Sequence, residues 1–405
     1  MWVFYFFAAL LIWQGIASLI GGVAFFNYVR REMNAARPAF APFASVIAPC
    51  RGLDQGLRDN LDALFRQDYP AYEIIFVTDS ADDPALAVVE EVSRAWKQEA
   101  RARSRVLIAG KATESGQKVH NLRAAVGQVD SLSEILVFVD TDARPRTHWL
   151  SSLVAPLADE GIGATTGYRW FIPARGGLAT HLRSVWNASI ASALGARGEK
   201  NFCWGGSTAI RLATFQKLNM LERWRGTLSD DFTLMRSLRR AQLPIHFVPA
   251  CLTASLEDCG FRELLEFTTR QLKITRVYAP QFWKAVLVGS LLFVFVFFGG
   301  LALVATRAML GQTYAAPLAL ICLIYALGIA KAALRWRAVS LPLNAYRARL
   351  RKSLAAHLLL WPLASVIYLY NALCAAFSRR INWRGITYEL KSPTETVIIE
   401  AVSNQ

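Results

Sequence analysis

EILVFVDTD, residues 134–142, joins a strongly apolar run to two aspartates. The run has no polar face, which is typical of a strand buried on both sides of a parallel sheet. Three earlier runs have the same character: SVIAPC (45–50), EIIFVTD (73–79) and SRVLIAG (104–110). Amphipathic helical patterns at 54–67 and 84–98 lie between such runs. This alternation of strand and helix predicts an α/β fold with a doubly wound, mostly parallel sheet.

Acidic residues follow two of the predicted strands. Asp79 ends the second run, and Asp140 and Asp142 follow the run that opened this section. Because ligands of doubly wound sheets bind beyond the carboxyl ends of the strands, we expect these carboxylates at a binding site. Asp140 and Asp142 can jointly hold a nucleotide diphosphate and a divalent cation, Mg²⁺ or Mn²⁺, since these metals prefer hard oxygen ligands.

Asp79 is our candidate for accepting hydrogen bonds from a nucleoside. Its neighbours Asp82 and Asp83 are alternatives for the same role. A solvated acidic turn with no role in binding is also compatible with this segment. The sequence leaves these alternatives open.

The motif SDDF precedes the helical run TLMRSLRR. Ser229 and Asp230 fit the N-cap of that helix, where a side chain accepts hydrogen bonds from free backbone amides. This interpretation leaves Asp231 to point into a cleft as a general base. Upstream, CWGGS (203–207) predicts a tight glycine turn at which a substrate can approach the backbone of Gly206 closely.

Apolar residues make up 54% of the 405-residue chain and charged residues only 19%, so part of the chain is expected in lipid. Residues 2–26 are long and apolar enough to cross a bilayer. A cleaved signal peptide is the competing interpretation, but the run is too long for one and lacks a preceding basic segment. Arg30 and Arg31 predict that the next segment is cytoplasmic. We expect an anchor at 1–29 in a multi-pass membrane protein with a cytoplasmic catalytic domain.

The sequence changes character after about residue 260. Residues 261–284, FRELLEFTTRQLKITRVYAPQFWK, mix charged and aromatic side chains at helical spacing, which predicts an amphipathic helix in the membrane interface. Arg270 and Lys273 share one face of that helix. They can bind a pyrophosphate or the headgroup of an acceptor, and binding of lipid phosphate is the alternative.

Three apolar stretches follow, at 285–305, 315–333 and 354–377. Together they form a predicted membrane region at 285–378, with a tail at 379–405. If all three stretches cross the bilayer, parity places the tail outside, whereas three arginines of the tail favour the cytoplasm: Arg379, Arg380 and Arg384. Pro362 interrupts the third stretch, which can therefore be re-entrant or interfacial. Two or three spans remain open.

The formal net charge is +15. Basic residues crowd beside the apolar runs, at Arg30 and Arg31 and between residues 331 and 352. This placement favours cytoplasmic loops and anionic lipid headgroups as the partners of the charge, and it argues against nucleic acid.

Taken in order, these segments resemble the ceramide glucosyltransferase group, family 21, among the family 2-type glycosyltransferases of the GT-A fold. The matching segments are residues 60–85 around the first aspartate, KVHNL (118–122), the second aspartate at Asp140, SDDF (229–232) and INWRGITYEL (381–390). The resemblance implies a GT-A-like, Rossmann-like catalytic domain at 41–260. It also implies donor binding by Lys118 and a general base at Asp231.

One motif departs from the group's pattern. The (Q/R)xxRW motif corresponds to Arg270–Ile274, so that Lys273 stands in the place of arginine and Ile274 in the place of tryptophan. Lysine keeps the charge but loses bidentate geometry. Isoleucine removes an aromatic platform near the acceptor, which Tyr278 or Trp283 can replace. The acceptor can therefore differ from ceramide, and hopanoids or other membrane lipids are the alternatives.

These observations predict an inverting, metal-dependent glycosyltransferase that moves glucose or N-acetylglucosamine from a UDP-sugar to a lipid hydroxyl. A processive polysaccharide synthase is the first alternative, but it needs a translocation pore and the intact acceptor motif. The second alternative is a non-catalytic membrane protein with a retained transferase fold.

Overall fold

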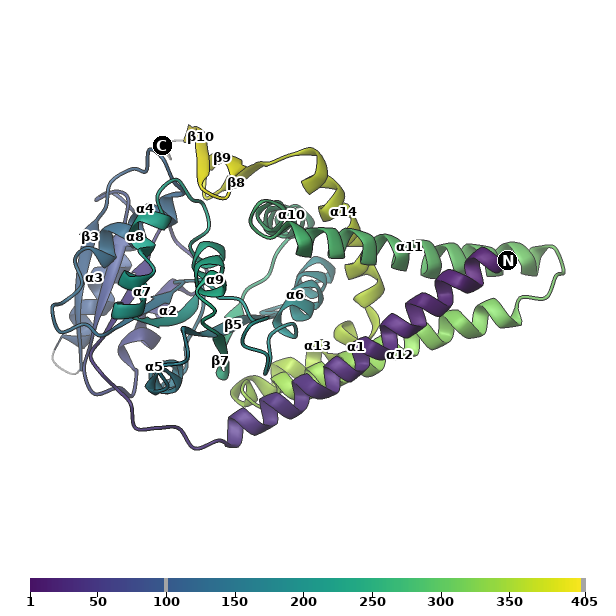
Figure 1. Ribbon diagram of the computed structural model, residues 1–405, viewed down its shortest axis with the longest axis horizontal. Coiled ribbons are helices and arrows are strands. Elements are labelled where there is room, and N and C mark those ends of the chain that lie inside the picture. The colour runs from purple at the N-terminus through teal and green to yellow at the C-terminus, as the bar shows by residue number, and fades with distance from the viewer. Residues whose placement is uncertain (98–100, 402–405) are drawn as a thin grey trace. The chain divides into compact units, whose positions relative to one another are not determined.

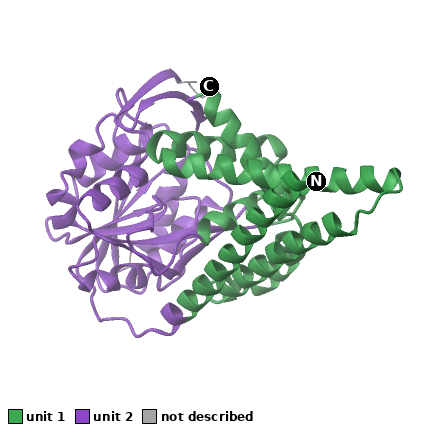
Figure 2. Cartoon of the chain, turned by 45° about the vertical axis from the view of Figure 1, so that its right-hand side comes forward, with its two compact units in different colours: residues 1–30, 173–192, 258–378 green, residues 31–172, 193–257, 379–405 purple. Residues whose placement is uncertain are grey.

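The computed structural model describes residues 1–97 and 101–401, which form two compact units (Figure 2). The helical unit consists of residues 1–30, 173–192 and 258–378, and the sheet unit consists of residues 31–172, 193–257 and 379–405. Residue 98 of the predicted helix 84–98 and residues 402–405 of the predicted tail lie outside the described residues.

The two units do not follow the order of the sequence. Helix α6 (Leu178–Ala191) lies inside the predicted domain 41–260 but belongs to the helical unit. The tail after residue 378 folds into strands and belongs to the sheet unit. The sheet unit is therefore assembled from three separate stretches of chain.

The sheet unit is built on seven strands in the order β3-β2-β1-β4-β6-β5-β7. Their bounds are β1 Ala44–Pro49, β2 Tyr72–Thr78, β3 Ala102–Ile108, β4 Ile135–Val139, β5 Ala164–Ile172, β6 Ser207–Arg211 and β7 Ile245–Leu256. All neighbouring pairs are parallel except those made by β6, which runs antiparallel to both β4 and β5. The predicted mostly parallel sheet is confirmed.

Helices cover both faces of this sheet (Figure 1). One apolar cluster joins it to α2 (Leu57–Phe65), α3 (Ala85–Trp96) and α5 (Trp149–Val154), followed by η1 (Ala155–Ala158). The opposite cluster joins it to α4 (Gln117–Val126), α7 (Leu212–Lys217), α8 (Met220–Arg223) and α9 (Asp230–Arg240). Along β1, Val46 and Ala48 face the first cluster and Ile47 faces the second, which explains why the strand is apolar on both sides.

One strand departs from the prediction. Residues 104–110 were expected in a strand buried on both faces, but β3 alternates between partly buried and exposed positions, with Val106 and Ile108 more than 40% exposed. The reason is its place at the edge of the sheet, where it pairs with β2 alone. An apolar run does not distinguish an edge strand from a central one.

The strand order reverses between β1 and β4. The chain adds β2 and β3 on one side of β1 and then places β4 on the other side. At such a switch point the loops that follow the two central strands diverge and leave a crevice, which is where doubly wound sheets bind ligands. Here those loops begin at Cys50 and Asp140.

A second, smaller sheet forms from the C-terminal stretch of the sheet unit. It has the order β10-β9-β8, and all pairs are antiparallel. Its strands are β8 Arg380–Trp383, β9 Ile386–Ser392 and β10 Glu395–Ala401.

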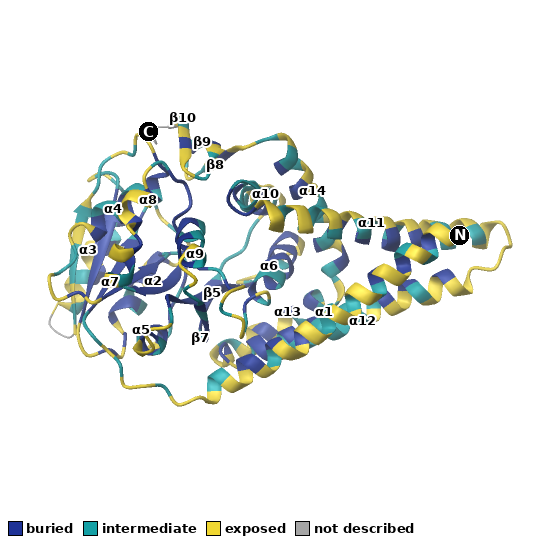
Figure 3. Ribbon diagram, in the orientation of Figure 1, coloured by how far each residue is buried: buried dark blue, intermediate teal, exposed yellow. Residues whose placement is uncertain are grey.

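The helical unit contains long apolar helices. Among the described residues, three helices are long and apolar enough to cross a membrane: α1 Trp2–Asn34, α11 Pro280–Met309 and α12 Ala315–Val339. Large apolar side chains are exposed along all three (Figure 3), as expected for helices that contact lipid. The remaining elements of the unit are α10 Phe261–Tyr278, η2 Asn344–Tyr346, α13 Arg347–Leu359 and α14 Trp361–Phe377.

The third predicted C-terminal stretch is broken. The segment Asn344–Leu359 meets α14 at an angle of 70°, next to Pro362. The chain leaves the sheet unit after residue 257 and returns to it at residue 379. The bent pair counts as one further span or as a re-entrant loop, so the choice between two and three C-terminal spans remains a prediction.

We expect Gly167→Ala to destabilise the sheet unit. A Cβ atom added at Gly167 would clash with the carbonyl oxygen of Cys251 and with the hydroxyl of Ser207. The carbonyl belongs to the backbone of β7, which cannot move away without disturbing the sheet. Overpacking of this kind costs about 1–3 kcal/mol. The thermal unfolding midpoint of the detergent-purified protein should fall. Gly195→Ala is the matched control, since its Cβ atom meets nothing within 4 Å, and an equal fall in both variants contradicts the prediction.

Candidate functional site

Lys118 lies between two carboxylates, of which Asp230 is buried and Asp140 is partly buried. Its ammonium nitrogen is 2.8 Å from Asp140 Oδ1 and 3.5 Å from Asp230 Oδ1. Lys118 comes from the first turn of α4, Asp140 follows β4, and Asp230 begins α9. Three segments that are distant in sequence are thus joined by one cation. The structure brings together Lys118 and Asp140, and their predicted role in binding a donor remains a prediction.

Arg169 holds the second carboxylate of the pair after β4. Its Nη2 atom is 2.7 Å from Asp142 Oδ1 and 3.5 Å from Asp140 Oδ2. The guanidinium lies over the rings of Trp204 and Phe171, with its central carbon 5.0 Å and 5.4 Å from their centroids. These rings fix its orientation, so Asp140 and Asp142 are held together by one arginine on β5.

The charged residues of this cluster shift the pKa values of one another. Burial disfavours the charged form of Asp140, but Lys118 and Arg169 outweigh that effect and lower its pKa. Burial lowers the pKa of Lys118, and Asp140 and Asp230 reverse this, so that the pKa is raised overall. For Asp230, burial and the neighbouring carboxylates prevail over Lys118 and raise the pKa to about 6. Asp230 therefore holds its proton more readily than Asp140.

Two glycines let this cluster form. A Cβ atom added at Gly205 would clash with Asp230 Oδ2 and would lie 2.7 Å from Lys118 Nζ. One added at Gly206 would lie 2.7 Å from Asp140 Oδ2. The antiparallel pairing of β6 with β4 places this turn beside the end of β4. The space beside Gly206 is occupied by the protein's own side chains, the ring of Trp204 and the carboxylate of Asp140. The contact of Gly206 with a substrate remains a prediction.

The start of α9 divides the aspartates of the SDDF motif. Ser229 is the N-cap as predicted, and its hydroxyl accepts a hydrogen bond from the amide of Phe232 at 3.3 Å. Asp231 accepts a hydrogen bond from the same amide at 2.7 Å and another from the Ser229 hydroxyl. The expectation that Asp230 serves as a cap is wrong, because its side chain is buried against Lys118. Asp231 is partly exposed, and its role as the base remains a prediction.

The three acidic residues after β2 have different environments. Asp79 forms an ion pair with Arg51 at 2.9 Å and is mostly buried. Asp83 accepts hydrogen bonds from the amides of Gly52 and Ala85, both at 2.9 Å. It therefore joins the loop after β1 to the start of α3. Asp82 is exposed. This arrangement favours Asp79 for binding a nucleoside, which remains a prediction.

Arg270 and Lys273 lie on α10 of the helical unit. Lys273 donates a hydrogen bond to the hydroxyl of Ser378 at 3.3 Å, and Arg270 lies over the ring of Phe267. The predicted interfacial helix 261–284 ends at Tyr278, and Pro280 starts the next helix. Both cations are partly exposed. Their role in binding an acceptor or a diphosphate remains a prediction.

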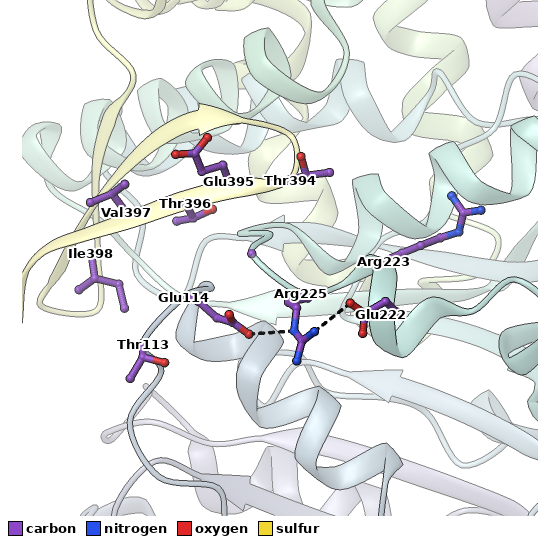
Figure 4. Close-up of a pocket in the computed structure, with 11 residues that line it drawn as sticks. Thr113, Glu114, Glu222, Arg223, Arg225, Thr394, Glu395, Thr396, Val397 and Ile398 are labelled. Atoms are coloured by element: carbon purple, nitrogen blue, oxygen red, sulfur yellow. Dashed lines mark hydrogen bonds and ion pairs between the residues drawn. The ribbon is translucent and has the colours of Figure 1, made fainter.

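A cavity of about 600 Å³ lies beneath β10, between the turn at 113–114 and the residues 222–226 (Figure 4). Arg225 forms ion pairs there with Glu114 at 3.3 Å and with Glu222 at 3.0 Å. The described residues that line this cavity include none of the site aspartates. It is distinct from the crevice at the strand switch.

Two members of the cluster were missed from the sequence alone. Arg169 stands in the apolar run of β5, and a charged residue in a strand that is otherwise buried signals a buried partner. Asp230 was set aside because Asp at a helix start is usually a cap. Its ion pair with Lys118 becomes visible only in the folded structure, where α4 and α9 lie close together.

That Asp140 and Asp142 hold a divalent cation remains a prediction. No group of three or more histidine, cysteine, aspartate or glutamate side chains suited to a metal occurs within residues 1–97 and 101–401. Two carboxylates suffice where substrate phosphates supply the remaining oxygens, as is usual for Mg²⁺. The residues present therefore fit a metal that binds together with a nucleotide diphosphate.

Comparison with known proteins gives a family match over most of the chain. A family model described as glycosyl transferase family 21 matches residues 10–396. Ceramide glucosyltransferase 1 of Caenorhabditis elegans is 28% identical over 136 residues, which are 32% of this chain and 28% of that protein. Ceramide glucosyltransferase of Komagataella phaffii is 27% identical over 89 residues, 21% of this chain and 18% of that protein. The chain thus matches less than a third of the length of either relative.

A solved structure also shows similarity. The mannosyltransferase PcManGT from Pyrobaculum calidifontis, in complex with GDP-Man and Mn²⁺, has a TM-score of 0.45 and 17% identity. The similarity covers 91% of this chain and 97% of that one.

We expect Lys118→Met to destabilise the protein strongly near pH 7.5 and less near pH 5.5. Removing one partner of a buried ion pair costs about 3–5 kcal/mol. A carboxyl whose pKa is higher in the folded than in the unfolded state stabilises the fold as pH falls through that pKa. Loss of Lys118 raises the pKa of Asp230 further and removes the charge that does most to lower the pKa of Asp140.

The measurement is the thermal unfolding midpoint of wild type and variant at about pH 7.5 and about pH 5.5. The difference between the two proteins should narrow at the lower pH. Lys217→Met, at an exposed site on α7, is the control for loss of a lysine. A difference that is constant with pH contradicts the proposed burial of Asp140 and Asp230 against Lys118.

Proposed function

The chain belongs to glycosyl transferase family 21, and we propose that it transfers glucose or N-acetylglucosamine from a UDP-sugar to a hydroxyl group of a membrane lipid, with inversion at the sugar carbon. Ceramide and hopanoids are the candidate acceptors. The observation that carries the proposal is the cluster of Lys118, Asp140 and Asp230 beside the strand switch, in a chain whose other unit consists of apolar helices.

The donor is assigned to the loops at the carboxyl edge of the sheet. Asp79, after β2, accepts hydrogen bonds from the uridine. Asp140 and Asp142 follow β4, which lies on the other side of β1 from β2. They organise the diphosphate together with Lys118. Parallel strands end at the same edge of the sheet, which is the reason for assigning these residues to one binding site.

Asp140 and Asp142 would hold a divalent cation, Mg²⁺ or Mn²⁺, on the diphosphate. When bound, the cation neutralises the negative charge that develops on the departing nucleotide. Arg169 keeps the two carboxylates close to one another before any ligand arrives. Lys118 supplies a further positive charge on the same side.

Asp231 acts as the general base. Its hydrogen bonds with Ser229 and with the Phe232 amide fix the carboxylate at the start of α9, while Asp230 beside it is bound to Lys118. The base takes the proton of the acceptor hydroxyl as its oxygen attacks the sugar carbon and the bond to the diphosphate breaks. A single displacement of this kind inverts the configuration.

The acceptor reaches the site from the lipid bilayer. Arg270 and Lys273, which lie on the helix that precedes the spans, bind the acceptor headgroup or the diphosphate. Arg30 and Arg31 at the end of the first apolar helix support a cytoplasmic position for the sheet unit. A soluble donor and a lipid acceptor thus approach from different phases.

Enriched membranes incubated with a panel of labelled nucleotide sugars should yield a labelled lipid. Mass spectrometry of the lipid extract identifies both the sugar and the acceptor. The same membranes without the protein are the control. Label that resists lipid extraction and has the size of a polymer supports a polysaccharide synthase instead, and absence of any transfer contradicts the proposal.

We expect Asp231→Asn to abolish transfer and to leave nucleotide binding intact. Loss of a general base costs about 10²–10⁴-fold in rate. The hydrogen bonds of Asp231 are with Ser229 and the Phe232 amide, whereas the ion pairs of the donor-binding Lys118 are with Asp140 and Asp230. Transfer in purified membranes and UDP affinity are measured side by side. Glu160→Gln, which removes the charge of an exposed carboxylate outside these motifs, is the control and should alter neither quantity. Full activity of Asp231→Asn removes the assignment of the base.

A further inference from the structure

The turn between β8 and β9 has an unusual residue in a left-handed conformation. Arg384 and Gly385 have φ angles of 53° and 76°. Two-residue hairpin turns of this type favour Asn-Gly or Gly-Gly, because a side chain with positive φ is strained. A non-glycine residue in this conformation persists where surrounding contacts hold it, and such residues concentrate at functional sites.

The contacts of Arg384 lie at the strand switch. Its Nη1 atom donates a hydrogen bond to the carbonyl oxygen of Arg51 at 2.9 Å, and its Nη2 atom lies 2.8 Å from Asp54 Oδ2. Both partners belong to the loop that follows β1, residues 50–56. A segment more than 300 residues further along the chain therefore holds the loop that follows β1 at the strand switch.

The charge of Arg384 also interacts with the carboxylates that follow β4. Burial lowers its pKa, but Asp54, and then Asp142 and Asp140, raise it, and the net shift is upward. The side chain is 38% exposed, so it is not sealed inside the unit. Its two contacts engage two of the five N–H groups of a guanidinium. Arg384 is therefore a partly exposed cation that is held by the loop after β1 and whose charge interacts with Asp142 and Asp140.

The same small sheet also contacts the helix that carries Lys118. The hydroxyl of Tyr388, on β9, accepts a hydrogen bond from the amide of Gln117 at 3.2 Å, and the Tyr388 side chain is buried. Gln117 is the first residue of α4, next to Lys118. The C-terminal sheet thus fixes the loop after β1 and the start of α4, which lie at the same edge of the main sheet.

We propose that the C-terminal sheet completes the donor site and that Arg384 is a donor-binding residue, whose guanidinium contacts the diphosphate of a nucleotide held at Asp140 and Asp142. Asp54 and the Arg51 carbonyl hold the guanidinium in position. The assignment rests on the proposed function, because it takes the crevice at the strand switch as the donor site. It adds a third cation, from a separate chain segment, to Lys118 and Arg169.

The test compares the binding of UDP and of uridine to the full-length detergent-purified protein. We expect Arg384→Gln to weaken UDP binding about tenfold, as for loss of one charged hydrogen bond, and to change uridine binding much less, since uridine has no phosphate. Arg384→Lys should restore part of the UDP affinity because it keeps the charge. Lys391→Gln, which removes an exposed ion pair with Glu389 on the same sheet, is the control and should bind like wild type.

The outcomes separate the two proposals. Equal weakening of UDP and uridine binding by Arg384→Gln means that Arg384 only maintains the fold, and this overturns the assignment. Wild-type UDP affinity in Arg384→Gln, together with its loss in Asp140→Asn, also overturns the assignment but leaves the proposed function standing. A wild-type protein that binds neither UDP nor GDP overturns both. Thermal unfolding midpoints, measured in parallel, identify any variant that fails to fold.

Discussion

The pairing of Lys118 and Arg169 with the carboxylates after β4 is the constraint on which the rest of the site depends. Several carboxylates this close together repel one another, and burial adds to the cost of their charges. Two cations on α4 and β5 offset both effects. The cluster in turn requires a turn without side chains beside it, which explains the glycines at 205 and 206.

The same charges connect stability to ligand binding. Under the proposed function, the cations gathered around Asp140 and Asp142 compensate the negative charge of a diphosphate as soon as it binds. Preorganisation of this kind avoids rearranging polar groups during the reaction. The C-terminal sheet extends the arrangement, because Arg384 and Tyr388 tie the loop after β1 and the start of α4 to one another. The site is thus assembled from both ends of the sheet unit's sequence.

Most of the fold followed from local patterns. Apolar runs such as residues 135–139 identified the central strands, since a strand covered on both faces has no polar side, and the long apolar helices were equally plain. The edge position of β3 was not foreseen, because pairing partners are not written in a strand's own composition. Nor was the transfer of α6 to the helical unit, which depends on contacts with residues far away in sequence.

The sequence by itself determined which segments carry the acidic residues of the candidate site and that part of the chain is suited to lipid. It did so because strand periodicity, aspartates at strand ends and long apolar runs are local properties. Only the tertiary structure decided which carboxylate meets which cation: Asp230 with Lys118, Asp142 with Arg169, and Asp54 with Arg384. Ion pairs form between side chains that the packing of distant elements brings within a few ångströms, and no spacing along the chain encodes that distance.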